Sequence, residues 1–231
     1  MTASGEKPPG YGGVGPTYPV GLLLSGRRCL LVGGGEVAVR KLVGLVDAGA
    51  EVTVVAPRLA EAVVGLAARV ERRPYQRGEV AGYWLAVAAT GRPEVDGEVF
   101  ADGEAAGVPV NAADDPQACS FVLPAVLRRG AVSVAVASEG TSPALAGWLR
   151  DRLAGLLAAE LPQLEELASL AGEARRQLRE AGVSTAALAW RPLYDQLAAL
   201  LASERAAEAR QLADGFVRAA RGAAPAGPPP P

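Results

Sequence analysis

Three consecutive glycines lie between an apolar run and a helical pattern, an arrangement that can bind a phosphate group. The run Cys29–Val32 is unbroken and apolar, as expected for a strand that is buried on both faces. The hexapeptide GGGEVA follows at residues 33–38 and fits the pattern G-x-G-x-x-A. Gly33 permits a tight turn, Gly35 lets the backbone approach a pyrophosphate, and Ala38 allows close packing of helix on strand. In this strand–helix context the pattern predicts a dinucleotide site, with the pyrophosphate on the free N–H groups at the helix start.

The residues that follow the second strand pattern bear on which dinucleotide binds. An acidic residue that would hold the adenosine ribose is expected about 20 positions after the glycines. The second strand, Val52–Val55, is followed instead by Ala56, Pro57 and Arg58. An arginine at this place could favour the 2′-phosphate of NADP, so the residues predict a dinucleotide and leave its identity open.

The chain contains no histidine, which restricts the chemistry that it can perform. Ser-His-Asp and Cys-His catalysis, His-ligated zinc and a histidine general base are all excluded. Proton transfer must therefore involve a carboxylate, a tyrosine, a cysteine or a substrate group. Asp114 follows the fifth predicted strand, at the carboxyl edge of the sheet where ligands of such folds bind. Its alternative role is to initiate, with Asp115, a turn before Pro116.

Composition and charge narrow the class of protein further. The 23 Lys and Arg residues nearly balance the 25 Asp and Glu residues, whereas a nucleic-acid-binding protein usually shows a strong basic excess. We therefore expect no nucleic-acid partner. Cys29 and Cys119 are expected to be reduced core residues, and they form no zinc motif. No signal core and no apolar run of about 18 residues occur, so we expect no membrane partner and a cytoplasmic location.

Hydrophobic patterning predicts alternating strands and helices up to about residue 115. The expected strands are 29–32, 52–55, 70–75, 83–89 and 108–111, and the expected helices are 36–48, 59–68 and 93–106. Such alternation with short loops predicts an α/β fold with a doubly wound parallel sheet.

The second half of the chain has a different pattern. Two more strands are expected, at 120–123 and 132–137, on either side of a turn. A helix is expected at 143–159, with Ser142 as its N-cap and Pro143 as its first residue. Further helices should extend to Arg221, with breaks at Gly182 and near Pro192.

Three separated motifs in this order resemble those of a known family. They are YPVGLLLSGRRCLLVGGGEVAVRKLVGLVDAGAEVTVVAP, NAADDPQACSFVLPAVLRRG and VAVASEGTSPALAGWLRDRL. Together they resemble the precorrin-2 dehydrogenase / sirohydrochlorin ferrochelatase family, whose module also forms the N-terminal part of siroheme synthases. The resemblance covers about residues 18–157. No methyltransferase domain follows, so the chain resembles the stand-alone form of this module.

The resemblance implies NAD-dependent oxidation of precorrin-2 to sirohydrochlorin on the path to siroheme. It implies NAD⁺ rather than NADP⁺ despite Arg58, and it matches Asp114 to the family's catalytic aspartate and Ser142 to a serine that is phosphorylated in some members. The residues expected to bind the cofactor are Gly33, Gly34, Gly35, Glu36, Val37, Ala38, Pro57 and Arg58.

A tetrapyrrole substrate bears many carboxylates, and the forked guanidinium of arginine suits such groups. Arg128, Arg129, Arg150 and Arg152 are therefore candidate substrate anchors, together with Ser142. No residue is predicted to be a metal ligand.

The family architecture implies a Rossmann-like domain, a small α+β dimerisation segment and a helical C-terminal domain, assembled as a homodimer. The expected divisions are an N-terminal arm at 1–17, the NAD-binding domain at 18–115, the dimerisation segment at 116–157, the helical domain at 158–222 and a Pro-rich tail at 223–231. The dimer interface is expected within residues 116–157.

Two alternatives remain open. In the first, the enzyme also inserts ferrous iron into sirohydrochlorin, a reaction for which Asp114 would serve without any further motif. In the second, the chain is a non-catalytic NAD-binding regulator whose helical half contacts partners. The regulator would bind the dinucleotide without turnover.

Overall fold

The computed structural model describes residues 17–223 except 114 and 187. These residues form two compact units, and each is described by itself. The first contains the described residues up to Leu123 together with Ser138–Ser142, and the second contains Pro124–Ala137 and the described residues from Pro143 onward.

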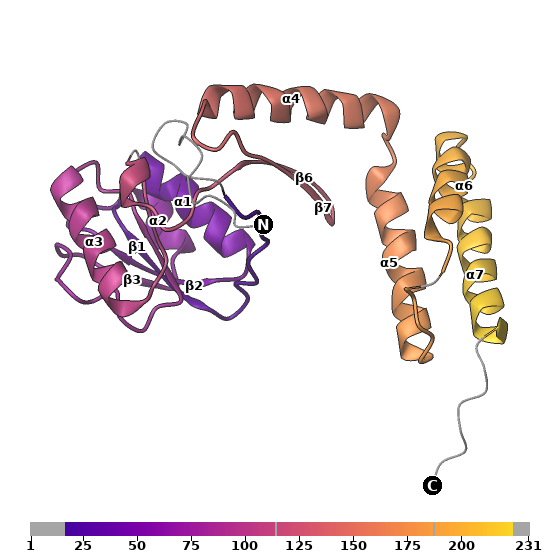
Figure 1. Ribbon diagram of the computed structural model, residues 1–231, viewed down its shortest axis with the longest axis horizontal. Helices are drawn as coiled ribbons and strands as arrows, with labels where there is room; N and C mark the ends of the chain where they lie inside the picture. Colours follow the sequence, from indigo (N-terminus) through magenta and orange to yellow (C-terminus); the bar gives the residue numbers. More distant parts are fainter. Residues whose placement is uncertain (1–16, 114, 187, 224–231) are drawn as a thin grey trace, which may run out of the picture. The chain divides into compact units, whose positions relative to one another are not determined.

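A five-stranded parallel sheet forms the centre of the first unit (Figure 1). Its strands are β1 (Arg28–Val32), β2 (Glu51–Val55), β3 (Arg69–Glu71), β4 (Leu85–Ala88) and β5 (Val110–Ala112). Their order across the sheet is β3-β2-β1-β4-β5. Strands β2 and β3 therefore lie on one side of β1, and β4 and β5 lie on the other side. The topological switch point therefore lies between β1 and β4, where doubly wound sheets bind ligands.

The carboxyl ends of four strands lie side by side. Val32 at the end of β1 pairs in register with Val55 of β2 and with Ala88 of β4. Ala88 in turn pairs with Ala112 at the end of β5. The loops that follow these strands therefore all emerge at one edge of the sheet.

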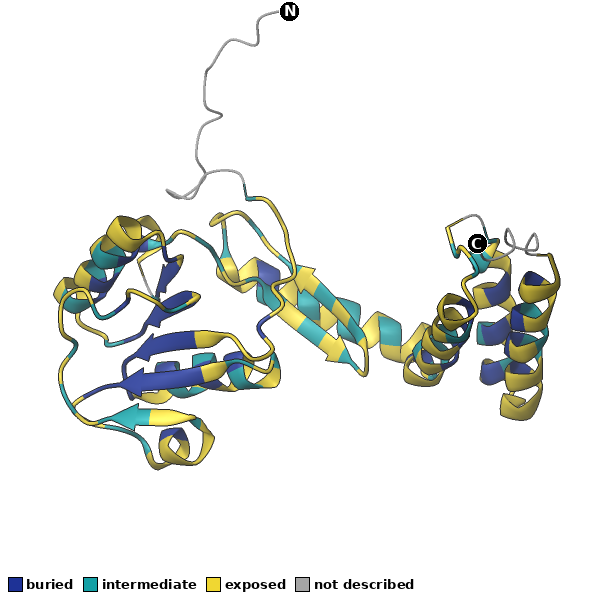
Figure 2. Cartoon of the chain, turned by 90° about the horizontal axis from the view of Figure 1, so that it is seen from below, coloured by how far each residue is buried: buried dark blue, intermediate teal, exposed yellow. Residues whose placement is uncertain are grey.

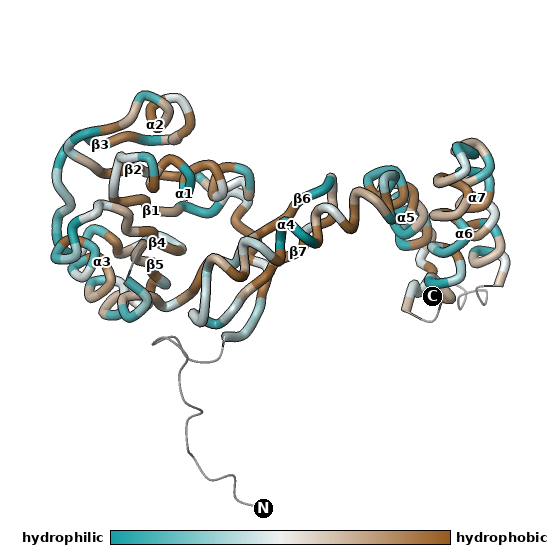
Figure 3. Tube along the Cα trace, turned by 90° about the horizontal axis from the view of Figure 1, so that it is seen from above, coloured by the Kyte–Doolittle hydropathy of each residue, from teal (hydrophilic) through white to brown (hydrophobic). Residues whose placement is uncertain are grey.

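Helices cover both faces of the sheet. On one face lie α1 (Glu36–Asp47) and α2 (Glu61–Leu66). On the other face lie α3 (Pro93–Ala106) and the 3-10 helix η2 (Pro116–Ala118). Because both faces are covered, the inner strands are buried along nearly their whole length, and Figures 2 and 3 show them as buried and hydrophobic.

An antiparallel hairpin and a long helix open the second unit. Strand β6 (Ala125–Arg129) pairs with β7 (Val132–Val136) across a two-residue turn in which Gly130 has a φ of 55°. Helix α4 (Pro143–Glu160) packs against the hairpin, and Ala146 is its buried residue. Along both strands half-buried residues alternate with exposed ones, as expected for a hairpin covered on one face (Figure 2).

Three further helices complete the second unit. They are α5 (Leu164–Glu180), α6 (Trp190–Ala202) and α7 (Ala206–Ala223), which lie side by side in Figure 1. Leu170 and Leu197 belong to the apolar core that these helices share. Each of the three has a stripe of buried residues at helical spacing, which explains their mutual packing.

The cysteines are free, and their environments differ. Cys29 is fully buried, and desolvation raises the pKa of its thiol to about 11. Cys119 is half-buried, and burial is also the main cause that raises the pKa of its thiol. Both thiols stay protonated near neutral pH. Cys29 is a core residue as predicted, whereas Cys119 lies at the edge of the core.

The predicted fold class is confirmed, since a doubly wound parallel sheet is followed by a helical region. No helix among the described residues is long and apolar enough to cross a membrane. The predicted arm and tail lie outside the described residues, except for Thr17 and Ala223. The functional division into domains stays a prediction.

Two predicted elements were wrong. The strand expected at 120–123 is absent, and its place in the hairpin is taken by β6, because the turn at Gly130 fixes which residues face β7. The helix break expected near Pro192 is also absent. Pro192 lies in the first turn of α6, where a helix tolerates proline, and the chain breaks after Ala202 instead.

Two glycines of α3 provide a matched test of the packing of this helix on β5. A Cβ on Gly103 would collide with the side chain of Val110 and lie 2.8 Å from the carbonyl oxygen of Val108, whereas a Cβ on Gly97 would meet no atom within 4 Å. We expect Gly103→Ala to lower the free energy of unfolding by about 1–3 kcal/mol through overpacking. Gly97→Ala should raise it by about 0.5–1 kcal/mol. Urea unfolding of both variants measures the difference, and equal effects would contradict the assigned packing.

Candidate functional site

The glycine loop after β1 passes directly over the end of β4. Gly33 has a φ of 129°, a conformation that side chains rarely adopt. A Cβ at this position would also collide with the carbonyl oxygen of Ala89, just after β4. Gly33 is therefore required by the turn and by the close approach to the neighbouring strand.

The second glycine is enclosed by the loop that follows β2. A Cβ on Gly34 would collide with the carbonyl oxygen of Arg58 and would lie 3.0 Å from Leu59. The N–H of Ala60 donates to the carbonyl oxygen of Gly34 at 2.8 Å, which fixes the two loops together. The middle glycine thus has a structural role that the G-x-G-x-x-A pattern does not specify.

The third glycine faces open space. Gly35 is the N-cap residue of α1, and a Cβ there would meet no atom within 4 Å. No side chain caps the helix, and the N–H groups of its first turn have no acceptor within the helix. Ala38, one turn on, is fully buried against the sheet. The start of α1 therefore has both the room and the donors for a pyrophosphate.

The loop after β2 lies where the adenosine ribose of a bound dinucleotide is expected. Pro57 and Arg58 are exposed, and Arg58 forms no ion pair among the described residues. The carboxylate of Glu71, at the end of the adjacent strand, is bound by Arg69 and Arg73. This end of the site thus presents the exposed guanidinium of Arg58, whereas the carboxylate of Glu71 is already paired.

The next described element after β5 is the 3-10 helix η2. Asp114, the predicted catalytic residue, lies outside the described residues. Asp115 caps η2, since its Oδ1 accepts a hydrogen bond of 3.0 Å from the N–H of Gln117. Asp115 is thus a turn residue, as the sequence predicted.

The candidate substrate anchors differ in what they contact. The guanidinium of Arg129 donates to the carbonyl oxygens of Leu157, Leu161 and Pro162, at 3.3, 3.3 and 2.9 Å. Its hydrogen-bonding groups are therefore occupied at the carboxyl end of α4, a use that the sequence pattern did not indicate.

The other three arginines retain solvent exposure. Arg128 and Arg152 are exposed and form no ion pair among the described residues, and Arg150 pairs with its neighbour Asp151 at 2.7 Å. Ser142 is half-buried in the turn before α4, where its N–H donates to Ser138 Oγ at 3.2 Å.

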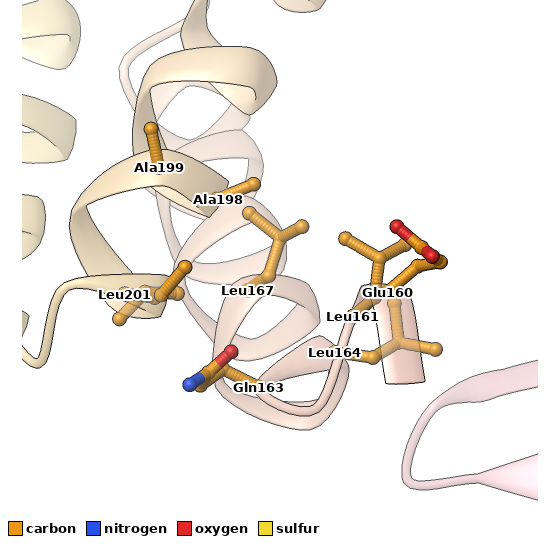
Figure 4. A pocket seen from close by; sticks show the side chains of 9 residues that line it. Glu160, Leu161, Gln163, Leu164, Leu167, Ala198, Ala199 and Leu201 are labelled. Carbon is orange, nitrogen blue, oxygen red and sulfur yellow. The ribbon is translucent and has the colours of Figure 1, made fainter. Parts of the chain in front are cut away.

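An apolar cavity of about 240 Å³ lies in the second unit, and none of the predicted site residues lines it. Figure 4 shows leucines of the α4–α5 connection and of α5 lining it together with residues of α6. Glu160 is the one charged residue in its wall. Since the cavity offers few polar groups that could orient a charged ligand, we do not assign it to substrate or cofactor. No group of three or more His, Cys, Asp or Glu side chains within the described residues could hold a metal ion.

Comparisons with known proteins agree with this geometry. A family model described as "Putative NAD(P)-binding" matches residues 20–125, which contain the sheet and the glycine loop. The fold also matches that of SirC, a precorrin-2 dehydrogenase, with a TM-score of 0.61 over 89% of this chain and 100% of that chain. At 22% identity this likeness supports the fold alone.

Relatives of higher identity are siroheme synthases. Siroheme synthase 3 of Aeromonas hydrophila is 40% identical over 208 residues, covering 86% of this chain and 43% of the relative. The siroheme synthase of Chromobacterium violaceum is 46% identical over 156 residues, covering 66% of this chain and 33% of the relative. The chain thus spans less than half the length of these relatives.

Fold and glycine loop together define a nicotinamide-dinucleotide-binding protein of the doubly wound α/β class. Within that class, the chain is homologous to the N-terminal part of siroheme synthases, which confirms the family resemblance of its motifs.

The three glycines have separable roles, which two variants can distinguish. Gly34→Ala should lower the melting temperature, because its Cβ would collide with the backbone of Arg58. Gly35→Ala should fold normally, since its φ of −86° suits alanine and the space is open. Its methyl group would stand where a pyrophosphate must approach, so we expect the affinity for NAD⁺ to fall by roughly tenfold or more. Thermal melts and NAD⁺ titrations test both, and unchanged affinity in Gly35→Ala would contradict the assigned pyrophosphate position.

Proposed function

We propose that the chain oxidises precorrin-2 to sirohydrochlorin with NAD⁺ as the acceptor, a step in the synthesis of siroheme. The observation that supports this most directly is the 40% identity to siroheme synthases over a region that contains the open, uncapped start of α1. SirC, whose fold this chain shares, is a precorrin-2 dehydrogenase, which agrees with the same reaction.

The glycine loop and the residues after β2 would hold the cofactor. Residues 33–38 would bind the diphosphate through backbone N–H groups, and Pro57 and Arg58 would lie at the ribose end. Bound NAD⁺ supplies the acceptor for a hydride. The fit rests on the open space at Gly35, where any side chain would reduce the room for a phosphate.

Asp114 would act as the general base. Dehydrogenation removes two electrons and one hydrogen nucleus as hydride, and a second hydrogen leaves the macrocycle as a proton. Asp114 would take that proton and later release it to solvent. A carboxylate suits this role because the chain has no histidine.

Substrate carboxylates need cationic partners, and three of the predicted arginines remain candidates. Arg128 and Arg152 are exposed and without an ion pair among the described residues, and the pair of Arg150 with Asp151 is a surface contact that contributes little to stability. Ser142 would add a hydroxyl near the start of α4. Arg129 is left out because three backbone carbonyls occupy it.

We propose that the chain forms a homodimer through the hairpin and α4. This region exposes large apolar side chains, which a monomer would leave in water. They include Val126 of β6 and Trp148, Leu149 and Leu156 of α4. Trp148 is 58% exposed, and tryptophan is among the residues enriched at interfaces.

Asp114→Ala tests the proposed base. A positioned base contributes about 10²- to 10⁴-fold, so we expect turnover of precorrin-2 to fall by that factor while NAD⁺ still binds. Asp115→Ala is the matched control and should affect only the stability of the turn that it caps. NADH formation measures turnover, and near-normal turnover in Asp114→Ala would assign proton removal to solvent or to the substrate.

The same assay separates the alternatives. NAD⁺ binding without any turnover of precorrin-2 would favour the non-catalytic regulator. Formation of siroheme from sirohydrochlorin and ferrous iron would establish the additional chelatase activity.

Cofactor preference tests the loop after β2. We expect kcat/KM to be higher with NAD⁺ than with NADP⁺, and Arg58→Ala to reduce mainly the activity with NADP⁺, because the guanidinium is the group that suits a 2′-phosphate. Steady-state kinetics with both cofactors measures this. Equal or higher efficiency with NADP⁺ would contradict the expected preference, and its loss in Arg58→Ala would assign NADP⁺ use to Arg58.

Trp148→Glu tests the proposed interface. A carboxylate in a desolvated apolar contact is strongly unfavourable, so the variant should sediment as a monomer at micromolar concentration while the wild type sediments as a dimer. Val64→Glu, at an exposed apolar residue of α2, is the control and should leave the dimer intact. A monomeric wild type would refute the proposal.

A further inference from the structure

Asn111 is a polar residue buried within β5. Its side chain is 6% exposed, and it pairs in register with Val87 of β4. Its neighbours Val110 and Ala112 belong to the apolar core on the α3 face. A carboxamide at such a position requires hydrogen-bond partners, because burial of an unpaired polar group is unfavourable.

The amide nitrogen of Asn111 has two acceptors on the returning chain. Nδ2 donates to the carbonyl oxygen of Phe121 at 2.9 Å and to Cys119 Sγ at 3.4 Å. Since a carbonyl oxygen can only accept, the contact with Phe121 fixes which end of the amide faces it. The donor end of Asn111 therefore joins β5 to the segment that returns after η2.

Further contacts on either side of Asn111 join β5 to the segment after η2. Asn111 and Cys119 form an isolated antiparallel bridge, and the N–H of Ser120 donates to the carbonyl oxygen of Val110 at 2.7 Å. The thiol of Cys119 lies 3.3 Å from the carbonyl oxygen of Ala112 and 3.2 Å from that of Asp115. Asn111 and Cys119 thus hold the end of β5 and the residues after η2 together.

The carbonyl oxygen of the Asn111 side chain, unlike the amide nitrogen, makes no hydrogen bond among the described residues. This atom, Oδ1, is buried. A leucine of nearly the same shape would fill this space without burying an unpaired oxygen. Packing alone therefore does not account for asparagine here, whereas its two donated hydrogen bonds do.

We propose that Asn111 is a positioning residue, whose carboxamide closes the loop between β5 and η2 and so fixes the backbone on both sides of Asp114. This inference rests on the proposed function, in which Asp114 is the base. The N–H of Ala113 donates to the carbonyl oxygen of Ala88 in the sheet at 2.7 Å. Asp115 is fixed by its contacts with Gln117 and Cys119. Because Asn111 is buried, the role assigned to it is to position the backbone and not to contact the substrate.

Asn111→Leu tests loop closure independently of activity. Hydrogen exchange of residues 112–118 should become faster by roughly tenfold or more, while β1 and β4 keep their protection and the affinity for NAD⁺ is unchanged. Thr53→Val, another buried polar residue of the same sheet, is the control and should leave exchange in the loop unchanged. Cys119→Ala removes the other contact across the loop and should speed exchange there in the same direction, which keeps the test decisive if Asn111→Leu folds poorly.

A double-mutant cycle tests whether Asn111 acts through Asp114. Asn111→Leu should lower kcat by roughly tenfold or more with an unchanged KM for NAD⁺, and it should lower kcat no further in the Asp114→Ala background. Equal losses in both backgrounds, or unchanged exchange of residues 112–118, would overturn the proposal. If the wild type does not oxidise precorrin-2, the proposed function fails, and the exchange measurement alone decides whether Asn111 closes the loop.

Discussion

The close passage of the glycine loop between the ends of β2 and β4 constrains the rest of the first unit. Gly33 lies against the carbonyl oxygen of Ala89, and Gly34 lies against that of Arg58. Two backbones can approach so closely only where no Cβ intervenes. Because the loop contacts both neighbouring strands, it fixes where α1 begins and which way its first N–H groups point.

The candidate cofactor site follows from this constraint. With Gly33 and Gly34 enclosed, Gly35 is the glycine of the loop that faces open space, and the uncapped start of α1 lies directly behind it. The sheet order places this point at the topological switch between β1 and β4. The candidate phosphate site is therefore made by backbone geometry and needs no charged side chain for its placement.

The parts of the structure that sequence could predict are those determined by neighbouring residues. The turn at Gly33, the buried Ala38 and the start of α4 at Pro143 depend on local pattern, and all three were predicted. The misplaced strand at 120–123 shows the limit, because only the pairing across the turn defines which residues enter the hairpin. The role of Arg129 could not be predicted from neighbouring residues either, since its acceptors lie 28 to 33 positions away along the chain.

The two parts of the candidate site are held in place differently, one by backbone packing and the other by side-chain hydrogen bonds. Substitutions should therefore affect the two parts differently. At the glycine loop, backbone packs on backbone, so almost any substitution at Gly33 or Gly34 disturbs the fold itself. At the end of β5 the loop is closed by side chains, chiefly the amide of Asn111 and the thiol of Cys119. Contacts of this kind depend on the identity of single side chains. In the proposed assignment, cofactor binding is therefore tied to backbone packing in the first unit, whereas the position of the proposed base depends on side-chain hydrogen bonds.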